Sequence, residues 1–490
     1  MRILLIDIDS LRPDHLSAYG YHRQTSPNID QIAADGMKFT NYYTSDAPCL
    51  PSRSAFISSR FGIHNGVVNH GGVASEFRND GPDRGFQDKL ANFGLVGYLK
   101  NQLNLNTALV SPFAERHSAW HFYAGFNEIY NTGKKGDERA DEITPVVMDW
   151  LKSHAQDDNW LLYVNYWDPH TPYRTPASYG NPFEDVPLKA FYTEELLAEH
   201  MQTVGPHTSQ EIGMYNSNAH KDYPRALGKL SNFDDLKTFI DGYDIGIHYA
   251  DAYIGKIIQY LKDHNLYEDT AIIITADHGE NQGEFGIYAE HATADKPTTN
   301  IPLILKMPNV PRGTTNTGLH YSLDLLPTLA EYFGLPQSDY WDGESFLHSI
   351  NNDPSEGRDE LILSQMAHVV QRSVRFDDWL YIRTYHDGYH LFPPEMLYNV
   401  QDDPYEQNNV AEEHPEVVRD AVYRLMNWQD KMLSTLEAPY QDPMWTVLQE
   451  GGPLHAKGEL PAYLDRLRDT GRGWAIEELR RRHPQEFNNK

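Results

Sequence analysis

Short apolar runs bounded by polar residues recur along the chain, at separations that suit strands alternating with helices. The runs that predict strands are 3–8, 107–110, 160–166, 271–275 and 303–306. Between the runs 160–166 and 271–275, residues 236–262 carry apolar side chains every three or four positions, which predicts an amphipathic helix. Residues 324–334 predict another helix, with Asp324 as its N-cap and Gly334 as its C-terminal stop. This alternation indicates an α/β fold with a large mixed, mainly parallel sheet flanked by helices.

The pattern changes after residue 355, where the apolar runs suit an antiparallel sheet and one long helix. The elements expected there are strands at 369–374, 379–385 and 396–400 and a helix at 416–433. We therefore expect a catalytic domain over residues 1–355 and a smaller C-terminal α+β subdomain with a basic tail over 356–490. The stretch 173–235 lacks a clear period, and so long an irregular connection is usually functional or disordered.

Composition narrows the possible partners. The 490 residues include 41 basic and 70 acidic side chains, a formal charge of −29, and 40% are apolar. The apolar share suits a large core and excludes a disordered chain. The negative charge argues against nucleic acid and anionic membranes as partners, and no apolar run approaches about 18 residues.

No secretory pattern precedes the first run, so we expect a cytoplasmic protein, or a periplasmic or secreted one if a leader has been removed. The lone Cys49 excludes an intrachain disulfide and any zinc or iron–sulfur cage built from cysteines.

Polar, chemistry-bearing residues follow three of the predicted strands. Asp9 follows the first, Asp168 and His170 follow the run at 160–166, and Asp277 with His278 follows the run at 271–275. Ligands bind outside the carboxyl ends of parallel strands. Carboxylates and an imidazole arriving there predict a divalent metal site, although each pair alone is as typical of a helix cap or turn.

The second local signal is the segment Cys49-Leu50-Pro51-Ser52-Arg53. A lone cysteine is commonly an inert core residue. Here the flanking prolines favour an extended loop that enters a helix, and Arg53 follows four residues later. This setting favours a reactive position beside an anion-binding arginine.

This segment resembles the Cys-x-Pro-Ser-Arg signature of the formylglycine-dependent type I sulfatases, a branch of the alkaline-phosphatase superfamily. Other segments resemble that family in the same order along about residues 1–430. They are Asp9-Ser10-Leu11-Arg12-Pro13-Asp14, Asp168-Pro169-His170-Thr171-Pro172-Tyr173, the Asp-His-Gly-Glu strand at 275–286, and the Leu-Tyr-Asn-Val strand at 397–400 with Asp403, Pro404 and Glu406. The resemblance implies an alkaline-phosphatase-like fold.

The resemblance also implies a chemistry. A formylglycine-generating maturation enzyme would oxidise Cys49, and the hydrate of the aldehyde would offer two hydroxyls. One attacks sulfur, and the other later loses its proton, which expels sulfate. Arg53 would stabilise the formylglycine oxyanion, and His170 would lie on the sulfate or leaving-group side. A calcium ion would be held by Asp9, Asp277, His278 and the modified Cys49.

Several positions depart from the family pattern. Ser10 stands where the family has a second aspartate, which leaves the expected metal set one carboxylate short. The segment 111–117 replaces the family's lysine–histidine loop, and Arg116 and His117 are candidates to take over its contacts.

The family's later lysine aligns with Glu290, which reverses the charge. His291 or Lys296 would then take over its contact, and His291 becomes a candidate general acid. An ordinary loop histidine is the alternative.

The leading hypothesis is a sulfuric ester hydrolase that removes sulfate from a sulfated carbohydrate, acting on the end of an oligosaccharide. The insertion 173–235, with His207, His220 and Lys221, would wall the pocket and bind substrate. One alternative is a phosphonate monoester hydrolase or phosphodiesterase that uses Mn²⁺ in place of Ca²⁺; such relatives are often multimeric, so a homo-oligomer stays open. Another is a binding protein that never matures, against which the intact signature argues.

Overall fold

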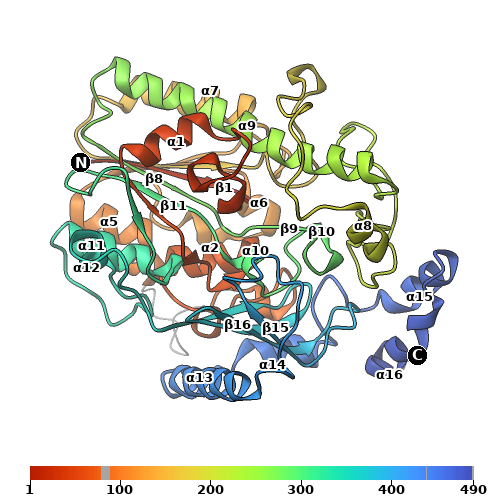
Figure 1. Cartoon of the computed structure of the whole chain (residues 1–490). Coiled ribbons are helices and arrows are strands. Elements are labelled where there is room, and N and C mark those ends of the chain that lie inside the picture. Colours follow the sequence, from red (N-terminus) through yellow and green to blue (C-terminus); the bar gives the residue numbers. More distant parts are fainter. Residues whose placement is uncertain (79–88, 438, 488–490) are drawn as a thin grey trace.

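A mixed sheet of eight strands forms the centre of the larger part of the chain (Figure 1). The computed structural model describes residues 1–78, 89–437 and 439–487. The strand order, within these residues, is β12-β2-β11-β8-β1-β7-β5-β6. Only β11 runs antiparallel to its described neighbours. The strands are β1 (Arg2–Ile8), β2 (Met37–Phe39), β5 (Asn106–Val110), β6 (Glu128–Tyr130), β7 (Trp160–Tyr166), β8 (Thr270–Thr275), β11 (Leu303–Lys306) and β12 (Thr314–Asn316). The predicted mainly parallel sheet is confirmed.

Helices cover both faces of this sheet. Figure 1 shows α1, α7 and α9 on one side and α2, α5 and α11 on the other. The helices of this part are α1 (Pro27–Ala34), α2 (Cys49–Ser58), α3 (Gly62–Asn65), α4 (Lys89–Phe93), α5 (Leu95–Leu103), α6 (Phe113–His117), α7 (Ala140–His154), α8 (Glu194–His200), α9 (Phe233–Asp263), α10 (Lys296–Thr299), α11 (Leu325–Tyr332) and α12 (Leu347–Asn351). The long helix α9 begins where the side chain of Asn232 accepts the N–H of Asp235 at 2.9 Å, and it contains the predicted helix 236–262.

The start of α11 agrees with one prediction in part. Asp324 occupies the N-cap position of α11 as predicted, but its side chain accepts the N–H of Tyr321 at 2.9 Å and makes no capping hydrogen bond to α11. The predicted stop is confirmed, since Gly334 follows the helix with φ +67°, a left-handed conformation that glycine adopts without strain.

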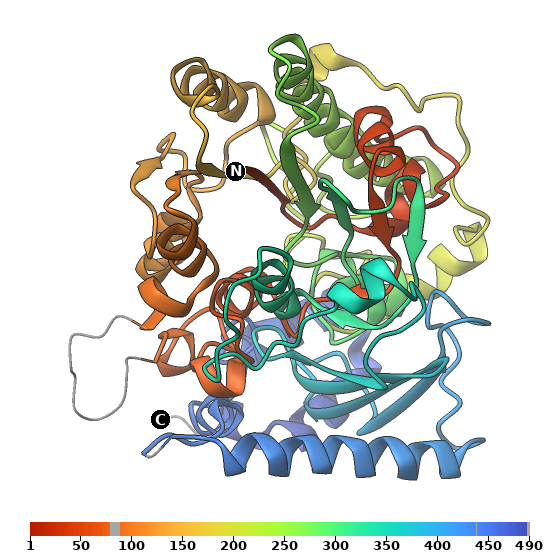
Figure 2. The same ribbon diagram turned by 90° about the vertical axis from the view of Figure 1, so that its left-hand side faces the viewer.

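A second sheet has the order β17-β16-β15-β14-β4 and packs against α13 (Pro415–Ser434), which lies along one edge of the molecule in Figure 2. Its strands are β4 (Asp46–Ala47), β14 (Glu360–Gln365), β15 (Val370–Phe376), β16 (Trp379–His386) and β17 (Glu395–Asn399). The three strands predicted between 369 and 400 and the helix after them are confirmed. The sheet also takes β4 from the N-terminal part, since β4 pairs in parallel with β14.

Two short pairings and the C-terminal helices complete the fold. The pairs are β3 (Tyr42–Tyr43) with β13 (His320–Tyr321), and β9 (Asn281–Gln282) with β10 (Tyr288–Glu290); the helices are α14 (Pro443–Gln449), α15 (Leu460–Asp469) and α16 (Ile476–Arg482). A fully buried ion pair at 2.7 Å joins Arg472 of this C-terminal segment to Glu211 of the 173–235 insertion. None of the described helices is both long and apolar enough to span a membrane.

Candidate active site

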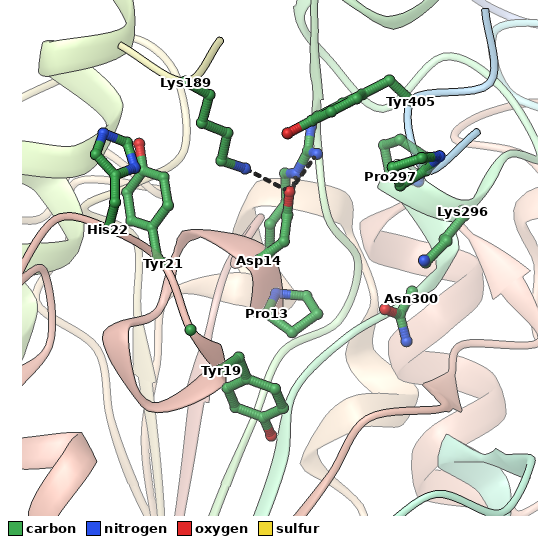
Figure 3. A pocket seen from close by; sticks show the side chains of 13 residues that line it. Pro13, Asp14, Tyr19, Tyr21, His22, Lys189, Lys296, Pro297, Asn300 and Tyr405 are labelled. Carbon is green, nitrogen blue, oxygen red and sulfur yellow. Dashed lines mark hydrogen bonds and ion pairs between the residues drawn. The ribbon is translucent and has the colours of Figure 1, made fainter. Parts of the chain in front are cut away.

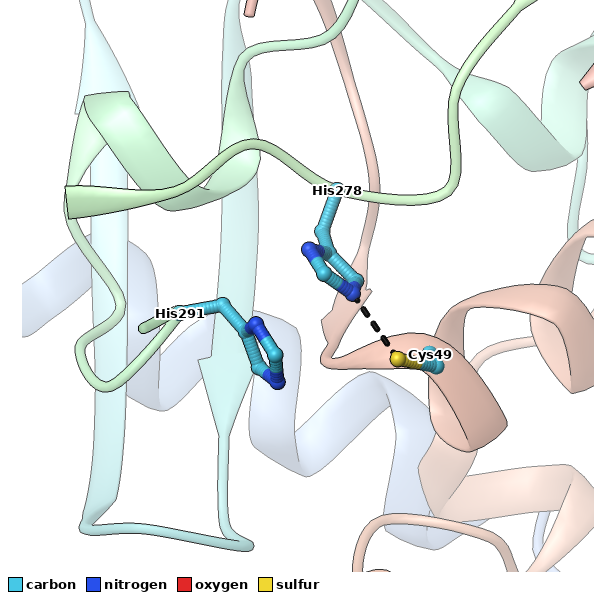
Figure 4. A group of neighbouring side chains, drawn as sticks. All are labelled: Cys49, His278 and His291. Atoms are coloured by element: carbon cyan, nitrogen blue, oxygen red, sulfur yellow. Dashed lines mark hydrogen bonds between the residues drawn. The ribbon is translucent and has the colours of Figure 1, made fainter. Parts of the chain in front are cut away.

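The carboxyl ends of two adjacent central strands bring the expected metal ligands together. Asp9 follows β1, Asp277 and His278 follow β8, and Cys49 is the first residue of α2. One ligand atom from each of these four buried residues lies within 4.8 Å of the others. The Cys49 sulfur lies 3.0 Å from Nε2 of His278, as the dashed line in Figure 4 shows. The structure thus brings these four residues together from three distant segments, and their role as metal ligands stays a prediction.

The local path of the chain explains why Cys49 reaches this edge. Strand β4 anchors the preceding residues in the second sheet, and α2 then runs through the interior with every residue buried. The Ser52 hydroxyl donates to the Asp277 carbonyl oxygen at 2.6 Å and accepts from Thr44 at 2.9 Å. The serine of the signature thus fixes the start of α2 to the end of β8.

Arg53 holds three carboxylates together. Its Nε lies 2.7 Å from Asp7, and its Nη1 lies 2.9 Å from Asp9 and 2.6 Å from Asp277. All four side chains are buried. Sequence reasoning did not assign Asp7 to the site, although a charge inside an apolar strand was a signal that it needs a partner.

These charges do not balance without a cation. With all three carboxylates ionised, the group has a formal charge of −2 in a buried space, which a divalent cation would neutralise; without a cation, burial raises the pKa of Asp7 and Asp277 and favours their neutral forms. Burial alone would raise the pKa of Asp9, but the adjacent positive charge of Arg53 holds it well below its ordinary value. Burial raises the pKa of Asp277 against the same arginine. The donor set of two carboxylates, an imidazole and the group at position 49 fits a divalent metal ion.

The surroundings of Cys49 also fit a modified side chain. Burial raises the pKa of the Cys49 thiol, and Asp9 and Asp277 raise it further, so an unmodified thiol stays protonated and is a weak nucleophile. Nη2 of Arg53 is buried and has no hydrogen-bond partner among the described residues. This orphan donor fits an oxygen-bearing group nearby, as a formylglycine at position 49 would provide.

Ser10 supports the site through hydrogen bonds. Its hydroxyl donates to Asp9 at 3.0 Å, and its backbone N–H donates to Asp277 at 3.2 Å. Its φ of 58° lies in the left-handed region, which a non-glycine residue adopts only where its surroundings hold it there. Ser10 thus orients the two carboxylates.

Histidines and an arginine border the other side of this group. Nε2 of His170 lies 4.0 Å from the Asp9 carboxylate, and burial lowers the pKa of His170 to about 3. The ring of His291 lies 4.1 Å from that of His278, and Figure 4 shows it facing the Cys49–His278 pair. Nε2 of His291 pairs with Glu290 at 2.8 Å.

Arg116 and His117 lie on α6 at the same border. The exposed Arg116 guanidinium lies 5.1 Å above the Trp167 ring and is close enough to lower the pKa of the buried thiol of Cys49, although burial outweighs it. Nε2 of His117 is buried without a described hydrogen-bond partner.

Three other predicted contacts lie elsewhere. Lys296 lines a cavity of about 350 Å³ together with Lys189 and Asp14, which Figure 3 shows. His220 stacks on Tyr223 at 4.5 Å, and Lys221 pairs with Asp222 at 3.9 Å, both on an exposed loop. Among the predicted contacts of the insertion 173–235, His207 lies next to this site, since its Nε2 is 3.0 Å from Glu290, the partner of His291.

Sequence reasoning missed three histidines that lie next to this group. His70, His368 and His455 come from separate loops, and the rings of His70 and His368 lie 6.4 and 5.4 Å from that of His291. Burial lowers the pKa of all three, to about 4 for His455, so they are neutral imidazoles at pH 7. Isolated histidines in loops carry no spacing signal, so only the fold reveals them.

The effect of burial on a carboxyl pKa can be tested at Asp168. Its carboxylate accepts the N–H of Ala140 at 3.1 Å and so caps α7 instead of joining the metal set. Burial raises its pKa from 3.8 to about 7. At a pH between these two values, the folded state keeps a proton that the unfolded state loses, so a rise in pH destabilises the fold through this group. Above pH 7 the loss in the free energy of unfolding is constant at about 4 kcal/mol.

We therefore expect Asp168→Asn to gain stability relative to the unsubstituted chain as the pH rises from 4 to 7, with no further gain above 7. Urea unfolding at pH 4.5, 7 and 9 measures this difference. An equal pH dependence in both chains would contradict the raised pKa.

Comparison with known proteins agrees with this arrangement. A family model described as Sulfatase matches residues 2–335, which include Asp9, Cys49, Asp277 and His278. The chain belongs to the sulfatase family. Its predicted class, sulfuric ester hydrolase, is confirmed with the family.

The choline-sulfatase of Rhizobium meliloti is 25% identical to this sulfatase over 467 residues, which cover 84% of this chain and 82% of that protein. The N-acetylglucosamine-6-O-sulfatase of Bacteroides thetaiotaomicron is 21% identical over 472 residues, with 83% and 82% covered.

Solved structures share the fold. The structure of BT4656 in complex with its substrate D-glucosamine-2-N,6-O-disulfate has a TM-score of 0.71 at 18% identity and covers 90% of this chain and 99% of that one. The phosphonate monoester hydrolase of Agrobacterium radiobacter has a TM-score of 0.65 at 20% identity, with 88% and 96% covered. At these identities the likeness establishes the alkaline-phosphatase-like fold that the sequence predicted, and nothing about substrate.

Proposed function

We propose that this sulfatase removes sulfate from a sulfated carbohydrate, using a formylglycine derived from Cys49 and a calcium ion held by Asp9, Asp277, His278 and the modified Cys49. The observation that carries the proposal is the position of Cys49, which opens a buried helix 3.0 Å from His278 and within the group of metal-ligand atoms. In the family, the metal ion supplies positive charge for the sulfate oxygens, and the formylglycine supplies a hydroxyl nucleophile.

The residues of this chain have distinct parts in the reaction. Arg53 offers its unpaired Nη2 to the oxygen group at position 49 and holds the carboxylates that would bind the metal. His170 and Arg116 lie where the sulfate enters and bind its oxygens. His117 adds a neutral imidazole at the same border.

We assign His291 as the general acid. Its Nδ1 is buried and has no described hydrogen-bond partner, so when the ring carries a proton on both nitrogens this atom is free to donate its proton to the leaving oxygen. Burial lowers the pKa of His291, and the Glu290 carboxylate 2.8 Å from Nε2 opposes that shift by stabilising the imidazolium. Glu290 therefore fixes the ring and supports the charged form.

A neutral carbohydrate leaving group suits the side of the site formed by His291 and Glu290 better than a leaving group that is itself negatively charged. A neutral imidazole has one donor and one acceptor, which match a sugar hydroxyl. Glu290 adds a negative charge that would repel an acidic leaving group. One of the curated relatives, the N-acetylglucosamine-6-O-sulfatase, acts on a glucosamine derivative by its name, which supports the same substrate class.

The test is a comparison of substrates with the calcium-loaded enzyme. We expect a larger kcat/KM on an aryl sulfate than on an aryl phosphonate ester. A dominant phosphonate rate, especially with Mn²⁺, would instead favour a phosphonate monoester hydrolase, whose fold this chain shares.

A panel of positionally defined sulfated mono- and disaccharides, with choline sulfate as the non-sugar control, then tests the substrate class by sulfate release. We expect release from a terminal sulfated sugar. Release from choline sulfate alone would refute the carbohydrate assignment and leave the sulfatase chemistry standing.

A further inference from the structure

We propose that His70, His368 and His455 form a second metal site, for a transition metal such as Zn²⁺, beside the Asp9–Asp277 group and distinct from it. One ligand nitrogen from each of the three histidines lies within 4.8 Å of the other two. Nδ1 of His70 lies 3.0 Å from Nε2 of His455. Two nitrogens that bind one tetrahedral zinc at 2.0–2.1 Å lie about 3.3 Å apart, so this pair is already spaced as zinc ligands are.

The backbone holds the three histidines in place from separate parts of the chain. The N–H of His455 donates to the carbonyl oxygen of Ala367 at 3.0 Å, which sets His455 beside His368. Oε1 of Gln365 accepts the N–H of His368 at 3.1 Å. The N–H of Leu454, next to His455, donates to Oδ1 of Asn69, next to His70, at 3.4 Å. A site braced in this way is arranged before any ligand binds.

The carboxylate of Glu290 contacts one of the three histidines, as carboxylates do in known zinc sites. Glu290 lies 3.4 Å from Nε2 of His368 through one oxygen and 3.0 Å from Nε2 of His207 through the other. Carboxylates that contact metal-binding histidines fix the ring orientation and raise the basicity of the ligand.

The ligand type selects the metal. Three imidazoles suit zinc, copper or nickel, whereas calcium prefers oxygen ligands such as Asp9 and Asp277. His70 and His455 are only partly buried, so an ion can enter from solvent. Three protein ligands leave a fourth position open, and the ring of His70 lies 6.4 Å from that of His291, so the open position is close to the sulfate site.

Zinc binding to the full calcium-loaded chain tests the proposal. A Cys49→Ala background is used, because Cys49, His278 and His291 form another group that would bind zinc through the thiolate. We expect one equivalent of Zn²⁺ per chain to remain after dialysis against calcium buffer. His368→Ala and His455→Ala should each weaken zinc binding more than about tenfold, and Glu290→Gln about tenfold or more.

His386→Ala is the matched control, since His386 is a buried histidine of a different histidine–carboxylate group. It should keep the retained equivalent. The proposal is overturned if the parent chain retains no zinc, or if the loss occurs in His386→Ala and not in the other two variants.

X-ray absorption at the zinc edge on the parent chain gives a readout that no misfolded variant can affect. We expect a first shell of nitrogen with the outer scattering of three imidazoles. A shell dominated by carboxylate oxygen would place the zinc at Asp9 and Asp277 and refute the tri-histidine site. Neither measurement depends on sulfate release, so both stand if the proposed substrate is wrong.

Discussion

Cys49→Ala is expected to lower sulfate release by about 10⁴-fold or more, since the variant lacks the only side chain that the maturation enzyme can convert into the nucleophile. The structure supports so large an effect, because the buried thiol is protonated and the sulfur lies among the metal-ligand atoms. The measurement is steady-state release of sulfate from an aryl sulfate by calcium-loaded enzyme. Hydrolysis that survives in Cys49→Ala would place the nucleophile at another residue.

Cys49→Ser is the matched variant, with a hydroxyl in almost the same position. A sulfated serine has no second hydroxyl to expel sulfate, so we expect at most one equivalent of the alcohol per chain and no steady state. Peptide mass spectrometry of residues 49–53 from active enzyme completes the test. An unmodified thiol in fully active enzyme would contradict the formylglycine mechanism.

The sequence predicted which residues meet at the site because the ends of the buried strands can be recognised from the sequence. The strands β1, β7 and β8 are mostly apolar and buried, and the acidic residues that follow them mark the carboxyl edge of the sheet. Asp9, Asp277 and His278 follow directly from that rule.

Other features depend on tertiary contacts that leave no local pattern. The direction of β11 is not encoded in its four apolar residues, and the pairing of β4 with β14 joins residues more than 300 positions apart. Lys296 illustrates the same limit. It is five residues from His291 in sequence, yet it is the first residue of α10 and lines a different cavity.

The histidine groups show this limit most clearly. His70, His368 and His455 each lie in a loop with no periodic signal, and hydrogen bonds between the loops bring them together. Glu290 seemed from the sequence to be a reversed charge at a lysine position, whereas the fold makes it the common partner of His207, His291 and His368. The acidic residue at this position therefore comes with three histidines that contact it.

Arg53→Met is expected to destabilise the calcium-free protein by about 3–5 kcal/mol, because it leaves three buried carboxylates without their shared cation. Arg53 pairs with Asp7, Asp9 and Asp277 at 2.6 to 2.9 Å, so the formal charge of the group falls from −2 to −3. Thermal unfolding in a calcium chelator measures the loss. We expect activity to fall as well, since the buried and unpaired Nη2, which we propose serves the group at position 49, is lost with the guanidinium.

The response to calcium separates this electrostatic role from simple packing. A more negative site is stabilised more by a divalent cation, so saturating calcium should raise the Tm of Arg53→Met by more than it raises the Tm of the unsubstituted chain. Arg372→Met is the matched control, since Arg372 is an equally buried arginine paired with Asp442 at 2.8 Å in the second sheet. That control should lose stability with an unchanged calcium shift. Equal calcium shifts in all three chains would mean that Arg53 does not share its carboxylates with a metal ion, and the assignment of Asp9 and Asp277 as ligands would fall with it.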